Sequence, residues 1–296
     1  MSYSQALEQQ LSLMAFMKSG RYEMSYDLML VEPAAGYTQA AQQAIPHILT
    51  KADPYYWAPE ICDLISTTSR TMPAYTLRPE DMPSPFGFCW FARKIALPSP
   101  DGLIGMADMT GFLWWADLDQ VWFTSLLGSV ERPEGAPGLS GIWQYGMDHE
   151  ELIRIGLPTE PEKAIKGDTI DVDTTVSRAV GQMRIIACCL AFMQQQVLVT
   201  TNERADRPSR KRALASLKHE PLVRVVRLRR KSSAGPVEDD REPAEWSHRW
   251  IVSGHWRQQY YPSTAERRPL FILPYVKGPE DKPLKPPRAK VFAVVR

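Results

Sequence analysis

The feature of this chain that most constrains its fold is an apolar helical pattern that ends near Leu198. Hydrophobic side chains recur at helical spacing along one face of this segment, at Val176, Ala179, Met183, Ile186, Leu190, Met193 and Val197. Between Ile185 and Leu190 nearly every side of the helix is apolar. A helix that is hydrophobic all round must be covered by other elements. The pattern therefore predicts a long helix that lies through the centre of the fold.

The chain before this helix divides into a helical section and a β-rich section. Apolar residues at helical spacing predict helices over residues 3–31, 38–49 and 59–69. Apolar and alternating runs then predict strands of an antiparallel meander, at residues 86–91, 103–108, 111–116 and 121–126. The glycines and prolines of residues 131–141 predict a loop.

The chain after the helix is predicted to be mostly β. Residues 221–230 alternate between apolar side chains and arginines, which predicts a strand with one arginine-lined face. Further strands are predicted at residues 246–253, 269–276 and 290–295. Residues 232–243 are polar and acidic and predict a loop, and the prolines of residues 277–287 predict an extended, unpaired segment.

Together these patterns predict the α+β class: N-terminal helices, a central antiparallel sheet, a long buried helix and a C-terminal antiparallel sheet. The corresponding sections are residues 1–80, which are helical, residues 81–201, which hold the sheet and the long helix, and residues 202–296, which form a basic sheet region. A chain of 296 residues can also bury all three sections in one compact domain.

Composition indicates a globular protein of a reducing compartment. Hydrophobic residues make up 44% of the chain, and no apolar run approaches the ~18 residues that a membrane span needs. The first residues lack the basic start and apolar run of a signal peptide. Cys188 and Cys189 are adjacent within the apolar helix, which favours buried reduced thiols. We therefore expect a cytoplasmic protein with no membrane partner.

Charge is divided unevenly along the chain, although the net charge is only +1. Residues 202–296 contain 22 Lys and Arg against 11 Asp and Glu, whereas residues 1–201 contain 13 against 23. A basic C-terminal third predicts a polyanionic partner such as RNA or DNA. The alternative is that the two oppositely charged parts of the chain attract each other.

Basic and aromatic residues concentrate in one C-terminal stretch, residues 247–261. His255 can move a proton, and Arg257 can hold a phosphate, so with Tyr261 they are the candidate catalytic residues for metal-free RNA cleavage through the ribose 2′-hydroxyl. Gly254 frees the backbone to approach a ligand or to make a tight bend. The candidate residues for binding nucleic acid or peptide are cationic or aromatic: Arg224, Arg227, Arg229, Arg249, Trp250, Trp256 and Tyr260.

The sequence lacks the motifs that mark common enzyme classes. No phosphate-binding P-loop, dinucleotide fingerprint, zinc-binding H-E-x-x-H or nucleophile elbow is present. We therefore expect no cofactor and no metal, and a binding protein is favoured over an enzyme.

The C-terminal part of the chain resembles a family carried by phages and plasmids, the type V-A anti-CRISPR family that suppresses production of an effector nuclease. The matching residues are Gly254, His255, Trp256, Tyr261 and Pro274. Ser253 and Arg257 depart from the family, which has a basic residue and a histidine at these places. The resemblance implies recognition of a nascent effector polypeptide, with loss of the corresponding mRNA.

Three functions remain open from the sequence. The first is a mobile-element, anti-CRISPR-like protein that binds a polypeptide, RNA or ribonucleoprotein and interferes with a host process. The second is a metal-independent endoribonuclease, a toxin or mRNA-decay factor, that uses His255 and Arg257. The third is a structural or assembly protein whose charged parts mediate self-association. The sequence does not determine the oligomeric state.

Overall fold

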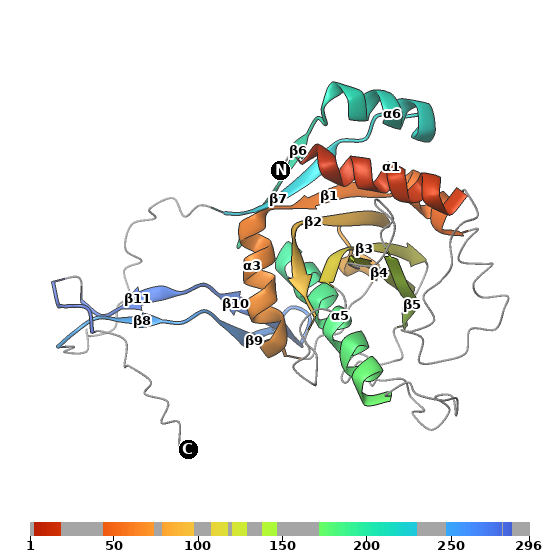
Figure 1. Cartoon of the computed structure of the whole chain (residues 1–296). Coiled ribbons are helices and arrows are strands. Elements are labelled where there is room, and N and C mark those ends of the chain that lie inside the picture. The colour runs from red at the N-terminus through yellow and green to blue at the C-terminus, as the bar shows by residue number, and fades with distance from the viewer. Residues whose placement is uncertain are drawn as a thin grey trace, which may run out of the picture.

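The computed structural model describes residues 3–18, 44–73, 79–97, 108–117, 120–128, 138–146, 172–229, 247–279 and 281–285. Within these residues a seven-stranded mixed sheet has the strand order β5-β4-β3-β2-β1-β7-β6, with helices on both faces (Figure 1). Two smaller antiparallel ladders follow near the C-terminus. Helices and strands in this arrangement confirm the predicted α+β class.

The predicted meander forms one half of the sheet. Its antiparallel strands are β2 (Phe86–Ala96), β3 (Asp108–Asp117), β4 (Gln120–Gly128) and β5 (Gly138–Gly146). Residues 103–107, part of a separately predicted strand, lie outside the described residues. The loop predicted at residues 131–141 is wrong from residue 138 onwards, because β5 begins at Gly138. Leu139 of β5 pairs with Leu126 of β4. Pairing with a neighbouring strand outweighs the weak strand preference of glycine.

The sheet is mixed rather than antiparallel because of a strand that the sequence patterns did not predict. β1 (Asp53–Trp57) runs parallel to β2 on one side and to β7 (Val223–Leu228) on the other. Tyr55, at its middle, faces Cys89 of β2 and Arg224 of β7. All three predicted sections of the chain therefore contribute strands to one sheet.

β7 confirms the strand predicted at residues 221–230 but not its arginine-lined face. It lies inside the sheet, between β1 and β6 (Leu198–Glu203). Val225 packs into the core on one face of the sheet and Val226 into the core on the other, and both are fully buried. A strand covered on both faces has no open face to present, so Arg224 and Arg227 are partly buried.

The helices form a layer on each face of the sheet (Figure 1). α1 (Ser4–Lys18), helical residues 44–51 and α6 (Arg207–Leu217) share one hydrophobic core with the sheet. α3 (Pro59–Thr68) and α5 (Val172–Met193) share the other. Two short 3₁₀ turns lie between α3 and β2 in the chain, η2 (Ser69–Thr71) and η3 (Pro79–Asp81). The predicted helices at residues 38–49 and 59–69 are thus confirmed with shifted ends, and residues 19–43 lie outside the described residues.

α5 confirms the predicted long buried helix. Ile186 and Leu190 are completely buried, and Ile185 is nearly so. The helix packs against the large aromatic side chains of the sheet, among them Trp57 and Phe112. Among the helices that the structure describes, none combines the length and hydrophobicity that crossing a membrane requires.

The four cysteines are free and buried in the core that α5 shares with the sheet, which confirms the predicted buried thiols. Burial raises the pKa of Cys62 to about 11 and that of Cys188 to about 12. It also raises the pKa of Cys89 and Cys189 well above the ordinary value. Since the thiolate is the reactive form, these thiols are unreactive in the folded protein.

Four short strands follow β7 after a stretch outside the described residues: β8 (Trp250–Val252), β9 (His255–Tyr261), β10 (Glu266–Ile272) and β11 (Tyr275–Lys277). The strand predicted at residues 269–276 is divided between β10 and β11, and the segments 232–243 and 290–295 lie outside the described residues. The segment 277–287 is not wholly unpaired, because Leu284 forms a parallel bridge with Arg249. Proline permits this pairing since the carbonyl oxygen of Pro283 accepts a hydrogen bond from the Arg249 N–H (2.8 Å).

Candidate nucleic-acid interface

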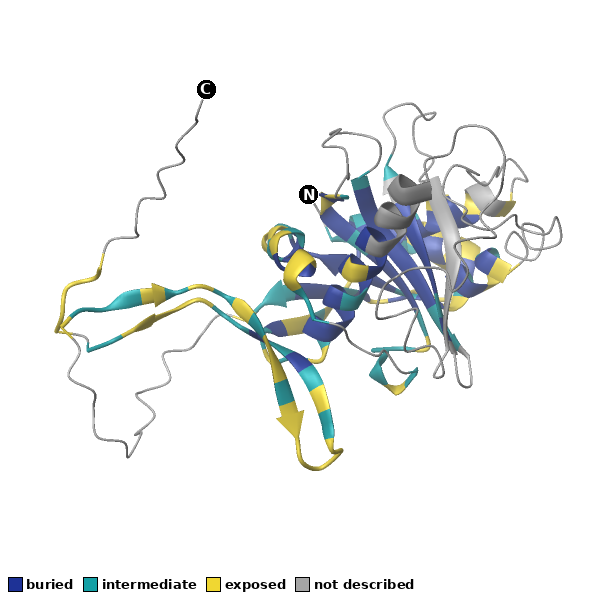
Figure 2. Cartoon of the chain, turned by 90° about the horizontal axis from the view of Figure 1, so that it is seen from below, coloured by how far each residue is buried: buried dark blue, intermediate teal, exposed yellow. Residues whose placement is uncertain are grey.

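β8 to β11 form one long hairpin, residues 250–277, which we call the C-terminal ribbon. Both of its ladders keep the same register, since Val252 faces Tyr275 and His255 faces Ile272 with no residue inserted between them. The ladder is interrupted beside Pro274, which has no N–H to donate. Figure 2 shows the two halves of the ribbon leaving the body of the protein in different directions.

Gly254, where the sequence predicts an approach to a ligand or a tight bend, lies at this interruption, close to other side chains of the protein. A Cβ atom at this position would lie 2.8 Å from Cζ of Phe271 and 3.1 Å from Cδ of Pro274. The approach is therefore to side chains of the protein's own second ribbon strand, and the absence of a side chain at Gly254 allows the two strands to pack.

Trp256 anchors the ribbon to the core. Its ring packs against Phe192 of α5 and Phe271 of β10, with centroid distances of 5.0 and 5.2 Å. Its indole Nε1 donates a hydrogen bond to the carbonyl oxygen of Thr68 (2.9 Å). The indole predicted to bind a partner is thus held by contacts within the protein.

A glutamine side chain also holds the ribbon. The amide Nε2 of Gln195 donates to the carbonyl oxygen of Pro269 (3.2 Å), and its Oε1 accepts from the N–H of Phe271 (2.9 Å). The amide thus pairs with β10 as a neighbouring strand would. This arrangement fixes β10 against the C-terminal end of α5.

Several cations of the basic third pair with carboxylates of the acidic part of the chain. Arg224 lies 2.6 Å from Asp53 and also donates to the Tyr55 hydroxyl (2.9 Å). Burial, only partly offset by a Ser84 hydrogen bond and the Arg224 charge, raises the pKa of Tyr55 to about 12. Two further pairs of this kind are Arg212 with Glu8 (2.7 Å) and Arg268 with Asp81 (3.3 Å). Part of the predicted attraction between the two oppositely charged parts of the chain is therefore present.

The two other arginines predicted to bind from the β7 region differ from each other. Arg227 donates to the Thr201 hydroxyl (3.1 Å) and lies 3.7 Å from Glu203. Arg229 follows β7 and is exposed. Its guanidinium has no hydrogen-bond or ion-pair partner among the residues that the structure describes. Of the three described arginines in and directly after β7, Arg224, Arg227 and Arg229, only Arg229 thus has its guanidinium open to a ligand.

The three candidate catalytic residues lie on one face of β9 but do not converge. His255, Arg257 and Tyr261 are exposed and share a face because side chains alternate along a strand. His255 and Tyr261 stand at opposite ends of β9, about 20 Å apart at the usual rise of a strand. His255 Nδ1 lies 3.0 Å from the carbonyl oxygen of Ser253. His255 and Arg257 can meet one phosphate, but Tyr261 cannot join them there.

The ribbon presents apolar and aromatic side chains to solvent beside its cations. Its exposed large side chains are Ile251, Tyr260, Tyr261, Tyr275 and Val276. The Arg267 guanidinium lies 5.9 Å from the Tyr260 ring, and the Lys277 ammonium lies 6.0 Å from the Trp250 ring. Cation–π pairs of this kind hold rings and charges side by side on the surface.

Arg249, the last predicted binding residue, stands at the far end of the ribbon. Its backbone N–H and carbonyl oxygen are both occupied, the carbonyl by the N–H of Lys285 (2.7 Å). Its Nε is buried and has no hydrogen-bond partner among the described residues. The backbone hydrogen bonds of Arg249 therefore join residues 283–285 to this end of the ribbon.

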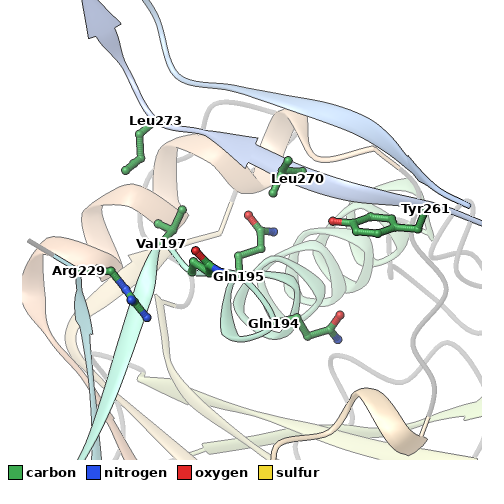
Figure 3. A pocket seen from close by; sticks show the side chains of 8 residues that line it. Gln194, Gln195, Val197, Arg229, Tyr261, Leu270 and Leu273 are labelled. Carbon is green, nitrogen blue, oxygen red and sulfur yellow. The ribbon is translucent and has the colours of Figure 1, made fainter. Parts of the chain in front are cut away.

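A cavity of about 500 Å³ opens where the end of α5 meets β10 (Figure 3). It brings together Arg229 and Tyr261, two predicted site residues that are distant in sequence. The sequence patterns did not indicate its other lining residues, which are Gln194, Gln195, Gln196, Val197, Leu270 and Leu273. The run of three glutamines directly after the apolar helix is a sequence signal that could have indicated this place.

Within the described part of the chain no group of His, Cys, Asp and Glu side chains is arranged to hold a metal ion. No family model matches the chain, and neither a curated protein nor a solved structure is significantly similar to it. The resemblance carried by Gly254, His255 and Trp256 therefore stays a prediction.

Proposed function

We propose that the protein is a mobile-element, anti-CRISPR-like binding protein whose C-terminal ribbon engages the RNA of a ribonucleoprotein and so interferes with a host process. The observation that carries the proposal is the exposed surface of cations and rings on the ribbon. Its members lie on both faces of the ribbon: Arg257 and Tyr261 share one face of β9, Tyr260 and its cross-strand partner Arg267 lie on the other, and Tyr275 belongs to β11.

Each component of this surface has a defined part in binding a single strand. Guanidinium groups displace the counterions of phosphates, which supplies affinity that falls steeply with salt. Exposed tyrosine rings stack on bases, a contact worth about 1–3 kcal/mol per base. The proposed surface excludes Arg224, Arg227 and Arg268, because their guanidinium groups already have partners within the protein.

A polypeptide is the second candidate partner, favoured by one observation. β9 pairs with β10 alone, so the other edge of β9 is open among the described residues. An extended peptide can add to an open edge through backbone hydrogen bonds. This mode fits the nascent polypeptide that the family resemblance implies.

RNA cleavage is a third possibility that the same variants test. His255 and Arg257 are exposed neighbours on one face of β9. In a ribonuclease, His255→Ala would abolish cleavage of a bound RNA and leave its affinity unchanged. In the binding protein that we propose, the RNA stays intact with the wild-type protein as well.

The test is the affinity for a fluorescent single-stranded RNA, measured by anisotropy over a series of salt concentrations. We expect the double variant Arg257→Ala/Tyr260→Ala to bind about tenfold or more weakly, and its salt dependence to be shallower by about one phosphate contact. The matched control is Lys211→Ala, which removes an exposed cation from α6 and should change affinity less than about twofold.

Two outcomes would overturn the RNA proposal. One is an affinity for RNA that does not change with salt. The other is equal binding by the ribbon variant and the Lys211→Ala control. Binding of an extended peptide that is lost in the ribbon variant, with no binding of RNA, would establish the polypeptide partner instead. Self-association that dissolves at high salt in ultracentrifugation would favour an assembly protein.

A further inference from the structure

The cavity at the end of α5 has an apolar floor and two polar residues at its rim. Val197, Leu270 and Leu273 supply apolar side chains, and Arg229 and Tyr261 lie on opposite sides of them (Figure 3). Its volume of about 500 Å³ lies within the range of about 300–1,000 Å³ that is usual for small-molecule sites. The cavity is therefore large enough for one small ligand.

The backbone holds both rim residues in place. The N–H of Arg229 donates to the carbonyl oxygen of Val197 (2.8 Å), which fixes the start of the arginine side chain beside the floor. Tyr261 is the last residue of β9 and pairs with Glu266 across the ribbon. Gln195 fixes the β10 wall through its two hydrogen bonds to Pro269 and Phe271. The backbone of both rim residues and the β10 wall are therefore fixed before a ligand binds.

The polar groups of the cavity differ in what they can still bind. The Gln195 amide is occupied by β10, and Gln194 Nε2 donates to the carbonyl oxygen of Asp81 (3.4 Å). Among the described residues, the Arg229 guanidinium, the Tyr261 hydroxyl and the Gln196 amide have no partner. The described residues that line the cavity include no Asp or Glu. A cation, an aromatic ring and an amide are thus available to a ligand, and no carboxylate among these lining residues repels an anion.

We infer that this cavity takes one nucleotide of the bound RNA, with its phosphate at Arg229 and its base stacked on Tyr261 over the apolar floor. The inference rests on the proposed RNA binding. Arginine matches phosphate geometry with two parallel donors, and an aromatic ring offers a face to any base. The Gln196 amide, which also lines the cavity, can donate to and accept from the edge of the base.

The test uses free mononucleotides, so that it does not depend on binding of a longer strand along the ribbon. Equilibrium dialysis with AMP should show saturable binding to the wild-type protein and weaker binding of adenosine, which lacks the phosphate. Arg229→Ala should lower AMP affinity about tenfold and leave adenosine affinity unchanged. Tyr261→Ala should lower both, whereas Tyr261→Phe, which keeps the ring, should lower neither.

The matched control is Arg227→Ala, which removes a guanidinium two residues away that already contacts Thr201 and Glu203. AMP affinity should be unchanged in this variant if it is folded, as circular dichroism will show. Absence of saturable AMP binding to the wild-type protein would overturn the inference. Equal AMP affinity in the wild type, Arg229→Ala and Tyr261→Ala would do the same, as would displacement of AMP by an acidic peptide at lower concentration.

The design separates this inference from the proposed function. If AMP does not bind but the ribbon variants still weaken RNA binding, the nucleotide cavity is wrong and the RNA proposal stands. If AMP binds and single-stranded RNA does not, the proposed function is wrong, and the cavity is a site for a free nucleotide.

Discussion

The indole Nε1 of Trp256 donates a hydrogen bond to the carbonyl oxygen of Thr68 over 2.9 Å, and so joins the C-terminal ribbon to the end of α3. The two residues are 188 positions apart in the sequence. Since the Trp256 ring also contacts Phe192 and Phe271, one side chain links the ribbon to two helices and to its own second strand.

We predict that Trp256→Phe lowers the free energy of unfolding by about 1–3 kcal/mol, because it removes the hydrogen bond to the Thr68 carbonyl oxygen and leaves a gap beside Phe192. Urea unfolding followed by circular dichroism measures this change. Tyr260→Phe is the control, since it removes an exposed hydroxyl and should change stability by less than about 0.5 kcal/mol. Equal stability of the two variants would refute the anchoring role.

The Arg224–Asp53 pair gives a second prediction, in a double-mutant cycle. The two side chains are about one third exposed, and Arg224 also lies over the Tyr55 ring at 5.2 Å. We expect Arg224→Ala and Asp53→Ala each to destabilise the protein, with a coupling free energy of about 1 kcal/mol after solvent screening. A coupling free energy near zero, measured from the four urea unfolding curves, would show that the two charges do not stabilise each other.

Stability should fall at alkaline pH. Folding raises the pKa of Tyr55 from 10.0 to about 12 and that of Cys188 from 9.0 to about 12. The folded protein therefore keeps protons that the unfolded chain releases, so the stabilisation is complete below pH 9 and is lost progressively as the pH rises towards 12. Between its unfolded and its folded pKa, each of these groups can lower the free energy of unfolding by up to about 1.4 kcal/mol for each pH unit.

This prediction is measured by urea unfolding at about pH 8 and about pH 10.5. Cys188→Ser serves as the matched variant, because its hydroxyl does not titrate in this range and can still meet Thr68, which lies 3.6 Å from the Cys188 sulfur. Between these two pH values the free energy of unfolding should fall less for Cys188→Ser than for the wild type. A free energy of unfolding that stays constant to pH 10.5 would contradict the expected release of protons by the unfolded chain.

Gly254→Ala should disturb the ribbon at its interruption. The new methyl group would lie 2.8 Å from Phe271 Cζ and 3.3 Å from the carbonyl oxygen of Ile272, so the buried Phe271 ring or the strand must shift. We expect a loss of about 1–3 kcal/mol in the free energy of unfolding. Ser253→Ala, an exposed neighbouring change, is the control. Unfolding curves that coincide for both variants would show that the ribbon yields here without cost.

The sequence predicted the elements of this fold better than their placement. The long buried helix was predictable, because Ile185 to Leu190 leave no polar face for solvent. β7 was predictable as a strand but not as an interior one, since its partner β1 comes from a distant part of the chain. β1 has five residues and a proline, which is too short a pattern to recognise between two helical segments.

The candidate site was predictable in composition but not in geometry. Residue types and spacing indicated a basic and aromatic segment around His255, and the ribbon presents one. They could not show which cations are occupied, because the partners of Arg224 and Arg268 are Asp53 and Asp81, far away in sequence. The cavity between Arg229 and Tyr261 likewise arises only when the ribbon folds back against α5.

The position of β7 between β1 and β6 has a consequence for how the protein is made. During synthesis β1 emerges early, yet its second neighbour is not available until residue 228 has left the ribosome. Until then a parallel edge of the nascent sheet stays open to pairing with other chains. Prematurely terminated products that end before β7 should therefore aggregate. The seven-stranded sheet can be completed only late in translation.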